Sequence, residues 1–320
     1  MPLIQQSAYQ APWFLPGAHI QTIVPSLTRL HWKIGYARER LELEDGDFID
    51  VDWMRSSGDL NRLMVVLHGL EGNSRAPYIV PLARKACESG YDVVVMNFRG
   101  CSGEPNRLSR FYHSGDTDDL HYLLTTLGAK YQSVSLVGFS LGGNIVLKYL
   151  GKEATSVPSN VSGAVAFSVP CDLAASAKKL ESWDNKIYMK RFMDLLCDKI
   201  EQKESLGYPR IDSRGCRKMK TFAEFDNEYT APLHGFDSAM DYWEQSSSLY
   251  YMEKIARPVL LVNASNDPFL PNSCLPKKIA TASEKLFLEI PETGGHCAFP
   301  GNIGSTYWFI RRALQFLDQF

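Results

Sequence analysis

The chain has 320 residues, enough to bury a sizeable core in one large domain or two smaller ones. Its hydrophobic share of 45%, charged share of 22% and formal net charge of −2 are typical of a soluble globular protein and argue against a nucleic-acid partner. No uninterrupted apolar run approaches about 20 residues, so we expect no membrane span.

The seven cysteines are scattered, odd in number and never spaced as C-x-x-C. This pattern argues against a disulfide framework or a zinc site and favours a reducing compartment. The N-terminal run MPLIQQSAYQAPWFLPG has neither a basic n-region nor an apolar h-region, so we expect no signal peptide. The expected location is the cytoplasm, and an aromatic-rich surface leaves a peripheral membrane contact open.

The N-terminal residues 1–35 are rich in proline and aromatic residues and have little periodicity. They predict an irregular arm wrapped on the body, with one helical turn around His19–Ile23. Next, Arg38–Met54 alternates apolar and polar residues around Asp45-Gly46, which is the pattern of a β-hairpin. From Arg62 onward, short apolar runs alternate with helical segments.

Six runs are apolar without alternation, which is typical of strands in a mainly parallel sheet covered on both faces. The predicted strands are Leu63–Leu67, Val93–Met96, Val134–Val137, Ala164–Phe167, Val259–Val262 and Leu286–Ile290. Helical spacing marks Tyr78–Ser89, Thr117–Leu127, Leu141–Gly151 and Tyr307–Leu317. A hairpin followed by β-α repeats predicts a mixed, mainly parallel α/β sheet with helices on both faces.

A long stretch without a strand signal separates the strand at Ala164–Phe167 from the strand at Val259–Val262. It is dense in charged residues, yet it has an apolar stripe at helical spacing. The stripe consists of Met189, Phe192, Met193, Leu196 and Ile200. We expect a helical lid over the sheet; the alternative is an ordinary amphipathic helix packed on the core. The predicted division is core over 1–173, helical cap over 174–236, and core again over 237–320.

The stretch Ser133–Leu150 contains the pentapeptide Gly-Phe-Ser-Leu-Gly, a G-x-S-x-G motif, between a predicted strand and a predicted helix. A strand that turns directly into a helix there holds Ser140 in a strained backbone conformation and exposes its hydroxyl at the top of a sheet. The helix that follows directs its N–H groups towards a developing oxyanion. Ser140 is therefore the predicted nucleophile.

A serine hydroxyl needs a base to accept its proton, and the base is usually a histidine oriented by a carboxylate. Among the seven histidines, only His296 lies beyond the last clear strand, in a glycine-rich turn that lets its ring reach Ser140. Asp267 leaves the strand at Val259–Val262 and is the predicted orienting acid. The alternative is Asp172, which follows the preceding strand in the same way.

The oxyanion formed during acyl transfer needs two N–H groups that are fixed before the reaction. We assign one to the amide of Leu141, next to the nucleophile, and the other to the amide of Leu70, in the loop after the first parallel strand. His68 begins that loop, and we expect it to shape the loop rather than to act as a second base.

The substrate pocket is predicted to be dominated by the lid side chains Met189 and Phe192, with His113 as a further lining residue. Tyr229 and His234 are predicted to lie where the lid rejoins the core. They either contact the acyl group or seal that hinge.

The run Asn97–Glu104 resembles a phosphate-cradling loop only loosely, because it lacks the spacing of the nucleotide-binding motifs. We expect Arg99 to anchor this loop by pairing with an acid such as Asp116. No histidine or carboxylate cluster has metal-ligand spacing, so neither a metal nor a cofactor is predicted.

Longer runs extend these motifs. They are HGLEGNS at 68–74, NFRGCSGE at 97–104, YHSGDTDDL at 112–120, GFSLGGN at 138–144, FDxxYTAPLHGF at 225–236 and GGH at 294–296. Together they resemble the YheT-like branch of the α/β-hydrolase superfamily over essentially the whole chain. The resemblance implies an α/β-hydrolase core with a helical cap and a triad of Ser140, Asp267 and His296. It also implies a carboxylic ester hydrolase, related to eukaryotic enzymes that act on medium-chain acyl esters and lipids.

The sequence thus predicts a serine esterase that hydrolyses short- to medium-chain acyl esters through an acyl-enzyme, with a small-molecule ester as its partner. Two alternatives stay open at this point. One is transfer of the acyl group to an alcohol or thiol instead of water, and the other is a non-catalytic binding protein on the same fold.

Overall fold

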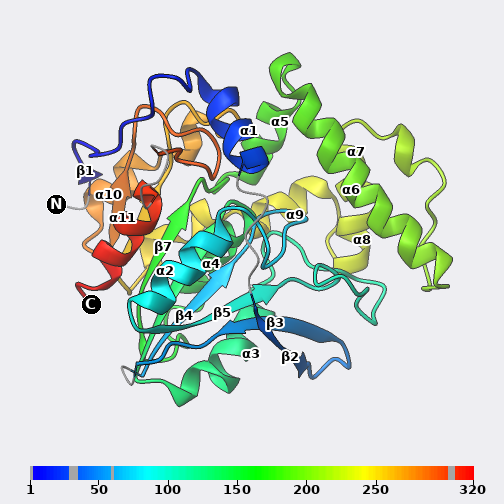
Figure 1. The fold of residues 1–320 in the computed structure, drawn as a ribbon. Coiled ribbons are helices and arrows are strands. Elements are labelled where there is room, and N and C mark those ends of the chain that lie inside the picture. Colours follow the sequence, from blue (N-terminus) through cyan, green and yellow to red (C-terminus); the bar gives the residue numbers. More distant parts are fainter. Residues whose placement is uncertain (1–2, 29–34, 59–60, 302–306) are drawn as a thin grey trace.

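The computed structural model describes residues 3–28, 35–58, 61–301 and 307–320 (Figure 1). Within these residues a nine-stranded sheet has the order β1-β9-β8-β7-β6-β4-β5-β3-β2. The strands are β1 (Leu3–Ile4), β2 (Ala37–Glu42), β3 (Phe48–Met54), β4 (Arg62–Leu67), β5 (Tyr91–Asn97), β6 (Ser133–Phe139), β7 (Val161–Phe167), β8 (Val259–Val262) and β9 (Leu286–Glu289). Only the β2–β3 and β3–β5 pairings in this sheet are antiparallel, so the predicted mixed, mainly parallel sheet is confirmed.

The central strands are apolar without alternation because both faces of the sheet are covered. In β4, Leu63, Val65 and Leu67 point into one apolar cluster, whereas Met64 and Val66 point into another. The first cluster is shared with α3 (Asp118–Thr126) and α4 (Leu141–Lys152), and the second with α2 (Ile79–Glu88) and α11 (Trp308–Leu317). Helices therefore lie on both faces, as expected (Figure 1).

The chain between β7 and β8, residues 168–258, is fully described and forms helices and loops without a strand. Its helices are α5 (Leu173–Leu180), α6 (Lys186–Ser205), α7 (Phe222–Phe225), α8 (Ala231–His234) and α9 (Ala239–Ser246). We call the whole of this segment, residues 168–258, the cap; it includes the range 174–236 predicted as a helical cap. Figure 1 shows α6 to α8 beyond one end of the sheet.

The apolar stripe on α6 was predicted to belong either to a lid or to a helix packed on the core, and its residues divide between these two positions. Met189, Met193 and Ile200 are buried in the same apolar cluster as one face of the sheet, so α6 packs on the core. Phe192 and Leu196 line the cavity that contains Ser140, which is the position expected for a lid helix.

One expectation about the cysteines is wrong. Cys197 on α6 and Cys216 form a disulfide with their Cα atoms 5.7 Å apart, whereas the other five cysteines are free. The cap folds back on itself, which brings together two thiols that lie 19 residues apart in the sequence.

The N-terminal arm is more regular than expected. In place of a single helical turn it forms α1 (Ala18–Thr28), and its first described residues form β1, which pairs with β9. Residues 1–2 and 29–34 of the predicted arm lie outside the described residues. None of the described helices is long and apolar enough to span a membrane.

Arg99 anchors its loop through other acids than Asp116. Its guanidinium binds Asp119 through two hydrogen bonds of 2.8 and 2.6 Å and also binds Asp45 and Asp47. These carboxylates come from the β2–β3 turn and from α3, so the side chain joins three segments at one edge of the sheet. The pKa of Asp116 is raised to about 7, chiefly because the carboxyl is buried.

Candidate active site

Ser140 lies at the junction between β6 and α4, with φ 50° and ψ −119°, a left-handed conformation that is strained for a residue with a side chain. The two flanking glycines allow this turn. A Cβ at Gly138 would lie 2.5 Å from the carbonyl oxygen of Gly142, and one at Gly142 would lie 2.5 Å from that of His68. The sharp strand-to-helix turn expected from the sequence is therefore present.

The three residues of the predicted triad lie in hydrogen-bond contact. The Ser140 hydroxyl is 3.0 Å from Nε2 of His296, and Nδ1 of His296 is 2.8 Å from Oδ2 of Asp267. The rival acid, Asp172, instead caps α5 by accepting a hydrogen bond from the amide of Ala175. The geometry therefore favours Asp267 as the orienting carboxylate.

The surroundings of His296 suit a base held in one tautomer. Burial alone would lower the pKa of His296, but the Asp267 carboxylate beside Nδ1 raises it above the usual 6.5. The ring of Phe269 packs on the imidazole at 4.3 Å between centroids, and the amide of Phe269 donates to Oδ1 of Asp267. A proton on Nδ1 leaves the lone pair of Nε2 directed at the serine hydroxyl.

The loop that carries His296 is held by α1, a contact that the sequence analysis missed. The amide of His296 donates to Oγ1 of Thr22 at 2.9 Å, and the amide of Gly294 donates to Oε1 of Gln21 at 3.0 Å. Gly295 has φ +63°, and a Cβ there would lie 2.8 Å from the amide nitrogen of Thr22. Nothing in the sequence distinguishes Gln21 and Thr22 from the other polar residues of the N-terminal arm.

The two residues whose amides are assigned to the oxyanion hole, Leu70 and Leu141, line the same cavity as Ser140. The described residues offer no hydrogen-bond acceptor to the N–H of Leu70 or of Leu141. The amide of Gly142 donates to the carbonyl of His68 at 3.1 Å, which ties the loop after β4 to the start of α4. Both free N–H groups are thus available to a ligand in this cavity.

His68 shapes the loop after β4, as expected. Its Nδ1 is 2.7 Å from the carbonyl oxygen of Gly69, and its Nε2 accepts a hydrogen bond from the amide of Phe98. Burial lowers the pKa of His68 to about 3, so the ring stays neutral at ordinary pH. Its nitrogens are occupied by backbone groups, which argues against a role as a second base.

A buried ion pair joins this loop to the cap. Nζ of Lys199 on α6 lies 2.9 Å from Oε1 of Glu71, the residue after Leu70, and both side chains are at most 10% exposed. The hydroxyl of Tyr112 donates to the same oxygen and accepts from the amide of Glu71. The backbone of Glu71 is left-handed, with φ 51°. Three side-chain and backbone contacts therefore hold a strained residue next to a proposed oxyanion donor.

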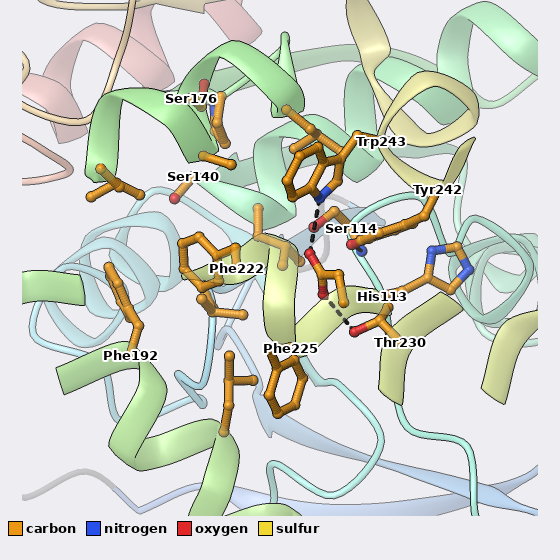
Figure 2. A pocket seen from close by; sticks show the side chains of 18 of the residues that line it. His113, Ser114, Ser140, Ser176, Phe192, Phe222, Phe225, Thr230, Tyr242 and Trp243 are labelled. Atoms are coloured by element: carbon orange, nitrogen blue, oxygen red, sulfur yellow. Dashed lines mark hydrogen bonds between the residues drawn. The ribbon is translucent and has the colours of Figure 1, made fainter. Parts of the chain in front are cut away.

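A cavity of about 840 Å³, its open mouth included, lies between Ser140 and the cap. Its walls are mainly apolar, and Figure 2 shows Phe192, Phe222, Phe225 and Trp243 around it. Among the predicted pocket residues, His113 and Phe192 line it.

The structure does not place Met189 and Tyr229 in this wall. Met189 points into the core below α6, and the Tyr229 hydroxyl donates to the carbonyl of Asp212 within the cap. The ring of His234 meets the ring of His113 edge to face, with 4.6 Å between centroids, and His234 does not line the cavity. Tyr229 and His234 are therefore not among the residues that line the cavity.

Asp226 is a pocket residue that the sequence analysis did not single out, although it lies in the FDxxYTAPLHGF run. It begins the π-helical turn Asp226–Thr230. Its carboxylate accepts hydrogen bonds from the Thr230 hydroxyl at 2.6 Å and from Nε1 of Trp243 at 2.9 Å, the two dashed lines in Figure 2. Burial raises the pKa of Asp226 to about 6. No group of three or more metal-ligating side chains occurs in the described part of the chain.

A strained serine between a strand and a helix, a histidine and an acid from later loops, and a mainly parallel sheet define the α/β-hydrolase class of fold. Comparison with known proteins agrees. The family model described as "alpha/beta hydrolase fold" matches residues 62–302, and the chain belongs to this family.

Similar proteins place the chain in the YheT-like branch. It is 36% identical over 290 residues to YheT of Escherichia coli (strain K12), named as a candidate esterase, with 88% of this chain and 84% of the relative covered. It is 26% identical over 308 residues to human phospholipase ABHD3, covering 93% and 75% of the two chains. The Pyrococcus furiosus esterase Pf2001 has the same fold, with a TM-score of 0.58, 15% identity, and 91% and 96% of the chains covered.

Proposed function

We propose that this α/β hydrolase is a serine carboxylic ester hydrolase that works through an acyl-enzyme. The observation that carries the proposal is the hydrogen-bonded series from Ser140 through His296 to Asp267, which opens into an apolar cavity. The esterase and phospholipase names of the relatives agree with it.

The proposed reaction follows from the positions of these atoms. Nε2 of His296 takes the hydroxyl proton while Oγ of Ser140 bonds to the carbonyl carbon of the ester. The N–H groups of Leu70 and Leu141 donate hydrogen bonds to the carbonyl oxygen and stabilise the negative charge that develops on it. The tetrahedral intermediate collapses, the alkoxide leaves with the proton held by His296, and the acyl group stays on Ser140. Water repeats the same steps and releases the acid.

Asp267 contributes in two ways. It fixes the proton on Nδ1 of His296, so that Nε2 is the basic nitrogen, and it stabilises the imidazolium that forms in each step. The left-handed backbone of Ser140 keeps Oγ at the cavity, where the substrate carbonyl lies.

The acyl group is proposed to occupy the apolar cavity under the cap. Phe192, Leu196 and Phe225 line the cavity, and these large side chains are proposed to restrict it to short- to medium-chain acyl groups. Transfer to an alcohol would use the same acyl-enzyme, so product analysis with added ethanol separates it from hydrolysis. A fluorophosphonate that fails to label Ser140 would favour the non-catalytic alternative.

The direct test replaces Ser140 with Ala and measures hydrolysis of p-nitrophenyl esters from C2 to C12. We expect kcat/KM to fall by at least about 10³, because removal of a triad nucleophile leaves only binding and oxyanion stabilisation. Ser205→Ala, at the exposed end of α6, is the matched control and should keep its activity. Turnover by Ser140→Ala within tenfold of the unmodified protein would overturn the mechanism.

A further inference from the structure

Large apolar side chains gather on one exposed part of the molecule. Of the eleven large hydrophobic residues that are exposed in the described part of the chain, seven lie on α1, just before it, or at the start of the cap. They are Trp13, Phe14, Ile20, Ile23, Leu27, Trp183 and Ile187, and we call them the apolar rim. Three of them are more than three-quarters exposed: Trp13 at 91%, Trp183 at 82% and Ile187 at 76%. Soluble proteins usually leave such side chains scattered singly.

The two parts of the apolar rim are joined by direct contacts. Nδ1 of His19 on α1 is 3.1 Å from the Tyr188 hydroxyl on α6, the two rings stack, and Nε2 of His19 is 3.6 Å from the Asp184 carboxylate. Trp183 and Ile187 flank these two cap residues in the sequence. Figure 1 shows α1 next to the cap helix α5. The start of the cap, which carries Trp183 and Ile187, therefore lies against α1, which carries Ile20, Ile23 and Leu27.

The charges around the apolar rim differ from those of the whole chain. Residues 3–28 contain no Asp, Glu, Lys or Arg. The cap segment 178–191 contains five exposed cations and two acids, a net charge of 5 − 2 = +3, whereas the whole chain has −2. The cations are Lys178, Lys179, Lys186, Lys190 and Arg191. An apolar surface bordered by lysines is complementary to an anionic lipid surface.

The apolar rim also lies close to the candidate catalytic base. Gln21 and Thr22, between the exposed Ile20 and Ile23, hold the loop of His296. On the cap side, the ring of Tyr188 packs on Phe269, which packs on the imidazole. On the cap side, two aromatic rings thus lie between this surface and the imidazole of His296.

We propose that the apolar rim docks on an anionic lipid surface. The two tryptophans and the aliphatic side chains of α1 enter the interfacial layer, and the cap lysines contact the anionic headgroups. Docking in this orientation brings the loop of His296, which Gln21 and Thr22 hold, close to the lipid layer. Only the use of lipid esters as substrates rests on the proposed function.

The test measures co-sedimentation of the full chain with vesicles of phosphatidylcholine, with and without 30% phosphatidylglycerol. We expect binding to the anionic vesicles, and an affinity at least fivefold lower for the neutral ones. The double variant Trp183→Ser, Ile187→Ser should bind the anionic vesicles at least tenfold more weakly. Leu206→Ser, an exposed apolar residue at the far end of α6, is the matched control and should bind like the unmodified protein.

Two further measurements distinguish a loss of vesicle binding from a loss of ester hydrolysis. The double variant should hydrolyse soluble p-nitrophenyl butyrate at the unmodified rate, and Ser140→Ala should still bind vesicles, so failure of catalysis and failure of docking are distinguishable. Equal binding by the unmodified protein and the double variant would overturn the proposal. So would a concentration-dependent dimer that the double variant abolishes, in a protein that ignores both kinds of vesicle.

Discussion

Replacing Lys199 with Met should impair the proposed reaction even though Lys199 does not border the cavity. The ammonium lies 2.9 Å from Oε1 of Glu71, and the side chains are 7% and 10% exposed. Removing one partner of a buried ion pair typically costs about 3–5 kcal/mol, because the remaining charge is left without compensation. The left-handed backbone of Glu71 favours movement of this residue once the contact with Lys199 is lost.

The movement bears on the reaction because Glu71 follows Leu70. If the N–H of Leu70 turns away from the cavity, one of the two proposed oxyanion donors is lost, which typically lowers kcat by about 10²–10³. KM should change little, because this contact strengthens only as charge develops on the carbonyl oxygen. The double variant Lys199→Met, Glu71→Gln removes both charges and should recover much of kcat.

The assay determines kcat and KM for p-nitrophenyl butyrate and the free energy of unfolding in urea. Lys190→Met is the matched control: it removes an exposed lysine of the same helix, and its effect on stability should stay within about 0.5 kcal/mol. If Lys199→Met loses stability but keeps kcat within twofold, Lys199 only fastens the cap, and the link to the oxyanion donor is refuted. Glu71→Gln alone provides a second measurement if Lys199→Met does not fold.

Two further predictions concern titration. Because Asp267 raises the pKa of His296 above 6.5, kcat/KM should rise with pH through a midpoint above pH 6.5. Asp267→Asn should lower the plateau of kcat/KM and move the midpoint to lower pH. An unchanged midpoint would contradict the effect of Asp267 on the pKa of His296. Asp226 has its pKa raised by burial from 3.8 to about 6, so its contribution to stability is complete below pH 3.8 and is lost as pH rises through 6. Asp226→Asn should therefore gain about 2 kcal/mol relative to the unmodified protein between pH 4.5 and pH 7 in urea unfolding, and a constant difference would show that the carboxyl is not titrating there.

The sheet could be predicted because its signal is local. Continuous apolar runs such as Leu63–Leu67 are needed wherever helices cover both faces, and each of the six predicted runs overlaps an observed strand. The triad residues could be chosen because their order along the chain and their positions after strands are constrained by the connections of the sheet.

The contacts that hold these residues could not be predicted in the same way. Gln21 and Thr22 bind a loop more than 270 residues later, through side chains that are ordinary in a surface helix. The residues that line the pocket also depend on how α6 is oriented about its own axis. Phe192 faces the cavity and Met189 faces the core, although both belong to one apolar stripe at helical spacing. Periodicity identifies the apolar side of a helix, but tertiary packing decides which part of that side meets the ligand.

The supports of the candidate site come from two helices outside the central sheet, α1 in the N-terminal arm and α6 in the cap. The loop of His296 is bound to α1, and the loop of Leu70 is bound to α6 through Glu71 and Lys199. The strands fix the backbone of Ser140, whereas the alignment of the proposed base and oxyanion donor depends on the N-terminal arm and the cap. The apolar rim also lies on α1 and at the start of α6. Binding of a lipid surface to the rim should therefore affect both the contact of α1 with the His296 loop and the contact of α6 with the Leu70 loop. Hydrolysis of a soluble ester should therefore change in rate when anionic vesicles are added, and this change should disappear in the Trp183→Ser, Ile187→Ser variant while its rate without vesicles stays the same.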